Sequence, residues 1–390
     1  MKILVITPIF PKKHETLTKV VNSFCEEWSK ENTVEVMHVY SKYPDWLEYI
    51  LLKISNLILN FRGHPLYLYS NKIKSEMINN NLSKNLIEFK KKYPTEFISS
   101  KKAIKISSKI TELISKKSFV PDVIIGHWIN PSILIINELK KKYPSSKTAI
   151  TIHVDPKRLD HVYKNLTFKK IFNNFNFVGF RSKGFMLNFP GNNQMHLCPS
   201  GIPSYFFSPV DKKFNKKMKI CFVGHLAKRK FPDSIIKALL LIKNNNFQSV
   251  SFYGDGPQLN KIKKYKKLSF YINLYGYIAR KKLPSEFDNH DIFIMISKKE
   301  AFGLVYLEAM SRGLITIAAE NEGMDGIIVD NINGFLVPAG DYIKLSKVLE
   351  LIQSMSDNEK IKISKNAIKT AKLYSNNQVA NQYLNNIHNA

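Results

Sequence analysis

Residues Ser297–Val337 have the sequence SKKEAFGLVYLEAMSRGLITIAAENEGMDGIIVDNINGFLV, and the prediction of the fold starts from this stretch. A short loop holds Glu300, Phe302-Gly303 follows, and a predicted helix then carries Glu308. The N-terminus of a helix has backbone N–H groups without internal partners and a partial positive charge, so it favours an anion. Glycine at the start of this helix lets the backbone approach a ligand closely.

The two carboxylates of this stretch, Glu300 and Glu308, stand eight residues apart, one before the helix and one within it. Carboxylates accept hydrogen bonds from hydroxyl groups. The pattern therefore suits a ligand that has phosphate in its middle and polyols on both sides, and a nucleotide sugar is such a ligand. The alternative interpretation is a buried Leu/Met helix whose glutamates only cap and solvate it.

The composition is that of a globular protein with a basic surface. The chain of 390 residues is long enough for two domains, and its hydrophobic content of 44% argues against general disorder. The formal net charge of +28 is spread over both halves of the chain. It indicates either a solvated surface or attraction to an anionic membrane or a phosphorylated acceptor. Nucleic-acid binding is not expected, because no RNP-type, zinc-finger or helix-turn-helix signature accompanies the charge.

The cysteines and the lengths of the apolar segments indicate the cellular compartment of the protein. Cys25, Cys198 and Cys221 have neither metal-ligand nor disulfide spacing, so we expect small core residues in a reducing compartment. The opening sequence MKILVITPIFP predicts a strand, because its apolar run is too short for a secretory signal. The sequence has no uninterrupted apolar run of about 18 residues, the length that would span a membrane. We expect a cytoplasmic protein, with the inner face of the cell membrane as a further possible location.

The first half of the chain predicts a Rossmann-like βαβ unit and a parallel sheet. Its opening consists of strands at Lys2–Thr7 and Val34–Val39 around a helix at Leu17–Lys30. Later strands are expected within Val120–Trp128 and at Thr148–Ile152, Phe175–Phe180 and Met195–Leu197, with a helix at Pro131–Lys141. His127 and His153 follow two of these strands at their carboxyl ends, where ligands gather in open α/β sheets. Each histidine is either a ligand contact or a packed, hydrogen-bonded residue.

Tyr43 to about Tyr93 has the character of an insertion. Its first part, DWLEYILLKISNLILNF (Asp45–Phe61), is rich in aromatic and aliphatic residues, but its charged residues exclude a spanning helix. The segment predicts either a helix that forms the wall of an acceptor site or an interfacial helix that lies on a bilayer. A long, lysine-rich helical stretch follows at Lys90–Lys117.

The second half predicts another α/β unit, which begins after a linker rich in Gly, Pro and Ser at Cys198–Pro209. A strand at Met218–Gly224 continues into a loop that contains Arg229 and Lys230, and a helix follows at Asp233–Lys243. A glycine after a strand, then cations and then a helix is a geometry that holds phosphate. The later elements are strands at Val250–Tyr253, Phe270–Tyr275 and Asp291–Ile296, a helix at Leu283–Asn289 and a helical region from Tyr342 to Ile387.

Five ordered motifs of the second half resemble those of family 4 glycosyltransferases. They are Val223-Gly224-x-Leu226 followed by Lys230, Tyr253-Gly254-Asp255-Gly256-Pro257, Gly276-Tyr277-Ile278, Glu300-Ala301-Phe302-Gly303-Leu304 with Glu308-Ala309-Met310, and Asn333-Gly334-Phe335-Leu336-Val337. The resemblance implies the α/β GT-B fold, in which two Rossmann-like domains with parallel sheets face each other across a cleft. Residues 1–204 would form the acceptor-side domain and residues 205–373 the nucleotide-sugar-binding domain. A C-terminal helix at about 374–390 would cross back to the first domain.

The resemblance also implies transfer with retention of anomeric configuration, and it implies roles for single residues. Glu308 would accept hydrogen bonds from the ribose, Glu300 would face the transferred sugar, and His153 would reach that sugar from the first domain. Lys230 would neutralise the departing diphosphate together with backbone amides at the helix N-terminus. The donor-binding residues would be Glu308, Gly224, His225, Arg229, Gly254, Tyr277, Ile278, Phe302, Gly303, Leu304 and Val305, and the catalytic ones Glu300, Lys230 and His153.

Two positions depart from the family pattern. Arg often follows the glycine of the phosphate loop, but this chain has His225, which is only partly protonated near neutrality. Lys230 and Arg229 would then carry more of the charge. The loop after the first strand, Pro11–Thr16, lacks the usual Gly-Gly pair. These departures leave open a catalytically silent GT-B module in a glycan-assembly complex, and a GT-B sugar-nucleotide epimerase is a further alternative.

The expected substrates follow from the resemblance. The donor would be a nucleotide diphosphate sugar, with UDP-sugar expected in preference to GDP-sugar. The acceptor would be a saccharide or polyprenyl-linked saccharide of a cell-surface glycan such as capsule or lipopolysaccharide. We expect no metal and no cofactor, because no Asp-x-Asp stands at the end of a strand. Residues 45–61 would provide peripheral contact with a membrane.

Overall fold

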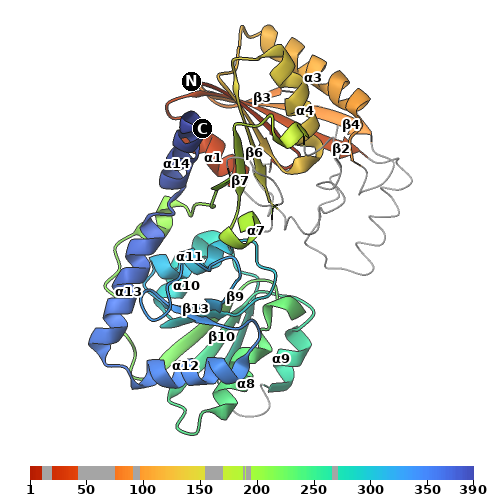
Figure 1. Ribbon diagram of the computed structural model, residues 1–390. Coiled ribbons are helices and arrows are strands. Elements are labelled where there is room, and N and C mark those ends of the chain that lie inside the picture. Colours follow the sequence, from red (N-terminus) through yellow and green to blue (C-terminus); the bar gives the residue numbers. More distant parts are fainter. Residues whose placement is uncertain are drawn as a thin grey trace. The chain divides into compact units, whose positions relative to one another are not determined.

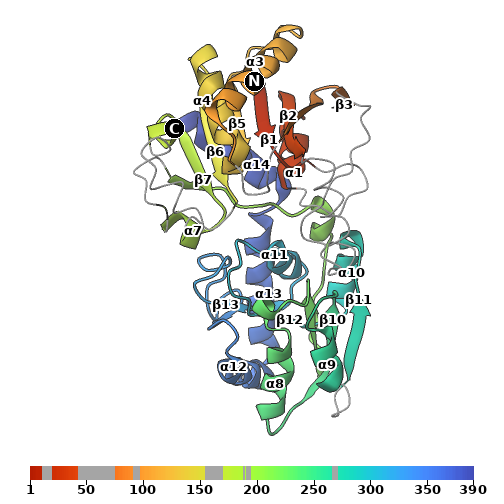
Figure 2. The ribbon, with the colours of Figure 1, turned by 90° about the vertical axis from the view of Figure 1, so that its right-hand side faces the viewer.

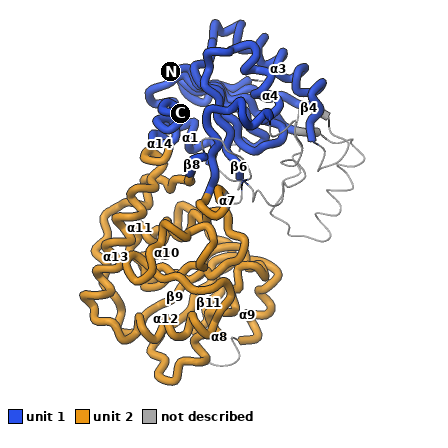
Figure 3. The backbone as a smooth tube through the Cα atoms, viewed as in Figure 1, with its two compact units in different colours: residues 1–181, 188–198, 380–390 blue, residues 182–187, 199–379 orange. Residues whose placement is uncertain are grey.

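The structure is a computed structural model that describes residues 1–10, 20–42, 75–90, 97–153, 170–187, 189, 195–265 and 271–390. The loop Pro11–Thr16 and the segment 45–61 lie outside these residues. The chain forms two compact units, which Figure 3 distinguishes by colour. Unit 1 consists of Met1–Arg181, Asn188–Cys198 and Ala380–Ala390, and unit 2 consists of Ser182–Leu187 and Pro199–Val379.

Unit 1 contains an eight-stranded sheet in the order β3-β4-β2-β1-β5-β6-β7-β8. The strands are β1 (Lys2–Thr7), β2 (Thr33–Lys42), β3 (Ser75–Asn79), β4 (Leu82–Lys90), β5 (Val123–His127), β6 (Lys147–Ile152), β7 (Phe177–Phe180) and β8 (Met195–Leu197). The predicted parallel sheet is confirmed from β4 to β8, whereas β3 pairs with β4 in antiparallel orientation.

Strands β3 and β4 were missing from the sequence prediction, which treated this region as an insertion. For β4 the reason is a buried polar cluster between β2 and β4. Ser83 Oγ and Asn85 Nδ2 both donate to Glu35, and Lys117 Nζ lies 2.8 Å from the same carboxylate. Polar residues in the interior of the sheet interrupt the alternation of apolar and polar residues from which a strand is predicted.

The helices of unit 1 lie on both faces of this sheet. They are α1 (Val20–Trp28), α3 (Ser100–Ser115), α4 (Ile129–Lys142) and the end of α14 (Asn376–Asn389). Neighbouring residues of a strand point to opposite faces. Gly126 faces α4, because a Cβ there would lie 2.5 Å from Ile136 Cδ1, whereas His127 faces Phe24 of α1 and Tyr383 of α14. Trp28 Nε1 also donates to Ala380 O at 2.9 Å, so the C-terminal helix returns to unit 1.

Unit 2 contains a six-stranded parallel sheet in the order β11-β10-β9-β12-β13-β14. The strands are β9 (Met218–Val223), β10 (Phe247–Tyr253), β11 (Ile272–Gly276), β12 (Ile292–Met295), β13 (Ile315–Ala319) and β14 (Phe335–Val337). Figure 2 shows β11 at the outer edge of this sheet. The order places β9 between β10, which follows it in the chain, and the later strand β12.

Two groups of helices cover the faces of this sheet, as Figure 1 shows. One consists of α8 (Asp233–Leu241), α9 (Leu259–Tyr265) and α12 (Tyr342–Ser354), and the other of α10 (Leu283–Asp288), α11 (Leu304–Ser311) and α13 (Asp357–Lys372). Among the described residues, no helix is long and apolar enough to cross a membrane.

Unit 2 begins before the sequence boundary at residue 205. Ile202 N donates to Tyr374 O, and Asn376 N donates to Ile202 O, each at 2.9 Å. Ile202 and Phe206 are also fully buried in the core of unit 2. These contacts join the linker to unit 2, whose continuous part begins at Pro199.

Candidate functional site

The loops after β9 and β12 leave the sheet of unit 2 at its topological switch point. In an open parallel sheet, the loops after two such strands diverge, and a crevice forms beyond their carboxyl ends. The loop after β9 contains Gly224 and Lys230, and the loop after β12 contains Glu300 and leads into α11. The two stretches singled out in the sequence therefore meet in one place.

Three charged side chains meet at this crevice. Arg229 Nη1 lies 3.3 Å and Lys230 Nζ 3.9 Å from Glu300 Oε2. Ser297 Oγ donates to the same oxygen at 3.3 Å. Burial lowers the pKa of Lys230, and Glu300 partly offsets this effect. Two cations against one carboxylate leave a positive excess that suits an anionic ligand.

Glycines let the loops after β9 and β10 pack backbone against backbone. Gly224 and Gly254 have φ values of 144° and 145°, a region that favours glycine, and a Cβ on Gly254 would lie 2.0 Å from Gly224 O. A Cβ on Gly224 would lie 3.0 Å from Lys230 Nζ. Leu226 N donates to Asp255 O at 2.9 Å. The glycines thus fix this loop and leave room for the ammonium of Lys230.

The N-terminus of α11 lies in the loop that carries Glu300. Gly303 caps this helix with φ 83°, and a Cβ there would lie 2.4 Å from the ring of Tyr306. Tyr306 is buried and donates to Met295 O at 2.6 Å, which ties the helix to the end of β12. The N–H groups of Leu304 and Val305 belong to the first turn, where a helix offers no internal acceptor. The side chain of Phe302 is buried, so only its backbone is available to a ligand.

Two residues that the sequence analysis did not single out hold this loop. Glu300 N donates to Glu322 Oε2 at 2.8 Å. A Cβ on Gly323 would lie 2.6 Å from Phe302 N, so the two backbones are in close contact. Both residues belong to the Glu-Asn-Glu-Gly sequence after β13. Gly323, three residues after Glu320, was the available signal in the sequence.

Glu308 is 3% exposed, and its partner is Arg280. Arg280 Nε donates to Glu308 Oε1 at 2.6 Å, and Nη2 lies 2.5 Å from the same oxygen. Burial raises the pKa of Glu308, and the nearby guanidinium opposes this shift. No described residue donates a hydrogen bond to the second oxygen, Oε2. The sequence analysis missed Arg280, because it begins an Arg-Lys-Lys run in a chain full of such runs.

The remaining predicted donor residues lie in the loops after β9 and β11 of the same unit. His225 is exposed in the loop after β9, and Tyr277, which is 62% exposed, and Ile278 follow β11. Gly276 O accepts a hydrogen bond from Gly254 N at 2.6 Å, which joins the loops after β10 and β11. The roles assigned to His225, Tyr277 and Ile278 stay predictions.

The two histidines of unit 1 form a neutral pair. His127 ends β5, His153 follows β6, and His127 Nδ1 lies 3.0 Å from His153 Nε2. Burial, and then the charge of Arg181, lowers the pKa of His127 to about 3 and shifts that of His153 in the same direction. The ring of Trp128 stacks on His153 at 4.0 Å between centroids. The predicted position of His153 at the carboxyl end of a strand is confirmed, but its contact with a donor stays a prediction.

Comparison with solved structures defines the class of fold. Over its whole length the chain is similar to Anabaena Alr3699/HepE, whose structure was solved in complex with UDP, with a TM-score of 0.67 and 14% identity over 100% of both chains. At such a low sequence identity, the structural similarity supports a shared fold and nothing further. This fold is GT-B.

A family model matches the sequence of unit 2. Residues 206–372, less than half of the chain, match the model "Glycosyl transferases group 1".

Two curated relatives match parts of the chain. An "Uncharacterized 41.2 kDa protein in cps region" of Klebsiella pneumoniae is 30% identical over 36% of this chain and 37% of its own length. A Campylobacter jejuni protein is 25% identical over 47% of this chain and 52% of its own length. Its name describes an alpha-1,4-N-acetyl-D-galactosaminyltransferase for a saccharide on PP-undecaprenol. The chain thus spans about half or less of the length of these relatives.

Proposed function

We propose that this chain is a retaining glycosyltransferase of family 4 that transfers a sugar from a nucleotide diphosphate sugar to a cell-surface glycan or lipid-linked saccharide. One observation carries the proposal. Arg229, Lys230 and Glu300 meet at the switch point of unit 2, beside the N-terminus of the helix that carries Glu308. The group 1 family and the motif series support the same conclusion.

The proposed roles follow from the charges of the site. The diphosphate lies against Lys230 and Arg229, and their charge stabilises it as it leaves the sugar. Backbone N–H groups of the first turn of α11 add to this stabilisation. Glu308 accepts a ribose hydroxyl with Oε2, while Arg280 holds Oε1 and favours the ionised form.

Two side chains, one charged and one neutral, are proposed to contact the transferred sugar. Glu300 faces its hydroxyls, and His153 contributes a neutral imidazole from unit 1. His153 Nε2 is occupied by His127 in the structure, so Nδ1 is the nitrogen left for a sugar hydroxyl.

The identity of the substrates is also part of the proposal. A UDP-sugar is favoured over a GDP-sugar, and the UDP in the Anabaena structure supports this choice. A polyprenyl-linked or other lipid-linked acceptor agrees with the name of the Campylobacter relative. Such an acceptor would bring the chain to a membrane, with residues 45–61 as the proposed contact. The reaction is proposed to need no metal.

The test is titration calorimetry of the chain with UDP, GDP and a panel of their sugar derivatives, followed by incubation with a lipid-linked acceptor. We expect binding of UDP and its sugars, and a product whose anomeric configuration matches that of the donor by NMR. Activity should persist in EDTA. If neither UDP, GDP nor any of their sugars binds, the enzyme proposal fails. Conversion of the donor without an acceptor would instead indicate an epimerase.

A further inference from the structure

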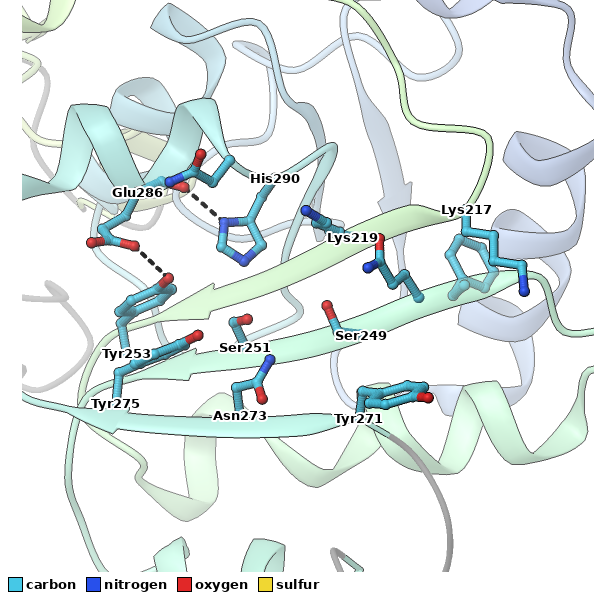
Figure 4. Close-up of a pocket in the computed structure, with 13 residues that line it drawn as sticks. Lys217, Lys219, Ser249, Ser251, Tyr253, Tyr271, Asn273, Tyr275, Glu286 and His290 are labelled. Carbon is cyan, nitrogen blue, oxygen red and sulfur yellow. Dashed lines mark hydrogen bonds between the residues drawn. The ribbon is translucent and has the colours of Figure 1, made fainter.

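A second concave surface lies on the face of the unit 2 sheet, over β9, β10 and β11 (Figure 4). It encloses about 690 Å³, within the range of small-ligand sites. Its floor consists of strand residues, and residues at the end of α10 form its wall. Because α10 covers only part of this face, the edge strand β11 contributes an open surface.

The register of the parallel strands arranges the floor in rows. Lys219 of β9 pairs with Ser249 of β10, and Ser251 pairs with Asn273 of β11. Tyr271 and Tyr275 stand at the two ends of the β11 side, roughly 13 Å apart along the strand. Lys217 precedes β9 at the same end as Tyr271. The floor therefore alternates aromatic rings with hydroxyl, amide and ammonium groups.

Several polar groups of this floor have no hydrogen-bond partner among the described residues. The side chains of Ser249, Ser251 and Asn273 form no hydrogen bond with any described residue, and the same holds for the ammonium groups of Lys217 and Lys219. A partly enclosed surface with this many unpaired donors and acceptors is suited to a ligand that is itself dense in hydroxyl groups.

The aromatic residues add flat surfaces to this polar floor. Tyr271 is 77% exposed, which is unusual for a large ring at the start of a strand. Tyr275 stacks on Tyr253 at 4.8 Å between centroids, so its ring is held in a fixed orientation. The C–H face of a sugar ring packs on such aromatic faces, while its hydroxyls reach amide and hydroxyl side chains. A protein partner would need an apolar centre that this surface lacks.

The charges of the groove lie at opposite ends. Lys217 and Lys219 stand at the amino-terminal end of the strands, and Glu286 stands at the carboxyl end (Figure 4). Glu286 accepts a hydrogen bond from Tyr253 at 2.7 Å, so its charge is partly compensated. His290 donates through Nδ1 to Glu286 O at 2.7 Å, and burial lowers its pKa, which keeps the imidazole neutral. The net charge facing a ligand at the lysine end is therefore positive.

We propose that this groove binds an acidic oligosaccharide, with sugar rings on Tyr271 and Tyr275 and a carboxylate or other acidic group at Lys217 and Lys219. The site is separate from the crevice beyond β9 and β12, and it does not depend on the proposed donor. It would let unit 2 bind a glycan chain at a place away from the reacting sugar.

The test is calorimetry of the full chain with tetragalacturonate and with maltotetraose, a neutral probe with the same number of sugar rings. We expect tetragalacturonate to bind at least tenfold more tightly than maltotetraose, and to lose most of this advantage at high salt. Lys217→Gln with Lys219→Gln should weaken tetragalacturonate about tenfold. Tyr271→Ala should weaken both probes. Lys344→Gln with Lys347→Gln, exposed on α12, is the matched control for charge and should change neither.

Several outcomes would overturn this proposal. They are no binding of tetragalacturonate to the wild-type chain, equal binding of the two probes, binding unaffected by the tyrosine variant, and an equal loss in the control pair. UDP binding measured on the same samples reports on folding and on the donor site. If the chain binds tetragalacturonate but no nucleotide, the proposed function fails and the proposal for the groove stands. If the chain binds UDP but neither saccharide, the proposal for the groove fails and the proposed function stands.

Discussion

The carboxyl ends of the two sheets carry different chemistry. In unit 2, the loops after β9 and β12 bring together Arg229, Lys230 and Glu300, which are all charged. In unit 1, the ends of β5 and β6 bring together His127 and His153, and burial keeps both uncharged. Similar α/β topology thus produces one end that attracts an anion and one that presents neutral nitrogens.

The difference would suit the two kinds of group in the proposed donor, a diphosphate and a sugar. A diphosphate needs fixed positive charge in a place where water is limited. A sugar hydroxyl needs hydrogen-bond partners, and a buried charge near it would add a large desolvation cost. The comparison predicts that removing charge damages function in unit 2, whereas adding charge damages stability in unit 1.

The largest expected effect is on turnover, from the loss of the buried cation in unit 2. Replacing Lys230 by methionine keeps an unbranched side chain but removes the charge that the proposed function places against the departing diphosphate. We expect kcat to fall about 100- to 1000-fold, as when one preorganised donor to a developing charge is lost. The measurement is steady-state transfer from the best donor found in the panel.

Lys228 offers a matched control, because it is an exposed lysine of the same loop. Lys228→Met should change kcat less than twofold. The pH profile separates charge from packing. Burial lowers the pKa of Lys230, so kcat/KM should fall on the alkaline side as this ammonium deprotonates, and Lys230→Arg should move that limb to higher pH. Equal losses in the Lys228 and Lys230 variants would contradict the electrostatic role.

The next effect concerns unit 1 and its response to acid. The pKa of His127 is about 3 in the folded chain and about 6.5 when unfolded, so the unfolded state binds more protons between these values. Stability should therefore fall as the pH drops below about 6.5. For His127 alone, the loss between pH 7 and pH 5 is about 2 kcal/mol. Among the described residues, no carboxylate shifts the pKa of either histidine, so none reduces this loss.

Tryptophan fluorescence follows this unit, because Trp28, Trp46 and Trp128 all precede residue 181. Urea unfolding at pH 7 and pH 5 should show the acid loss in the wild-type chain and a smaller one in His127→Asn. His388→Asn, at an exposed position of α14, should behave like the wild type. An unchanged acid loss in His127→Asn would mean that this histidine does not carry a lowered pKa.

The sequence predicted the strands and the charged loops better than it predicted the pairs that hold them. Strands such as β1, β5 and β9 are short apolar runs bounded by proline, glycine or aspartate, and these local signals survive in the fold. Strand β4 was missed because its interior face carries Ser83 and Asn85, which bond to Glu35 across the sheet. Long-range polar pairs of this kind have no local signature.

The same limit applies to the candidate site. Lys230, Glu300 and Glu308 are visible in the sequence, because each follows a strand or glycine at a characteristic spacing. Arg280 and Glu322 contact them from other loops, and only the tertiary structure shows those contacts. In a chain with 59 Lys and Arg residues, a single functional arginine cannot be recognised by its charge.

The smallest expected effect is on stability, and it tests whether the buried charge of Glu308 depends on Arg280. Replacing Arg280 by methionine leaves Glu308 buried without its cation, and the pKa of Glu308, already raised by burial, should rise further. The ionised form then costs stability above the unfolded pKa of glutamate. We expect a loss of about 1 kcal/mol at pH 7, less than for a fully buried pair, because Arg280 is about one-third exposed and partly screened.

The pH dependence of this loss distinguishes charge from packing. At pH 4, Glu308 is protonated in the Arg280→Met variant, so the loss should nearly vanish, the opposite of the acid sensitivity expected for unit 1. The double variant Arg280→Met with Glu308→Gln removes the charge itself and should recover most of the stability at pH 7. Far-UV circular dichroism during urea unfolding, read beside tryptophan fluorescence, separates unit 2 from unit 1. A loss that is equal at pH 4 and pH 7, and that the double variant retains, would show that Arg280 supports unit 2 by packing on Phe206 and not by its charge.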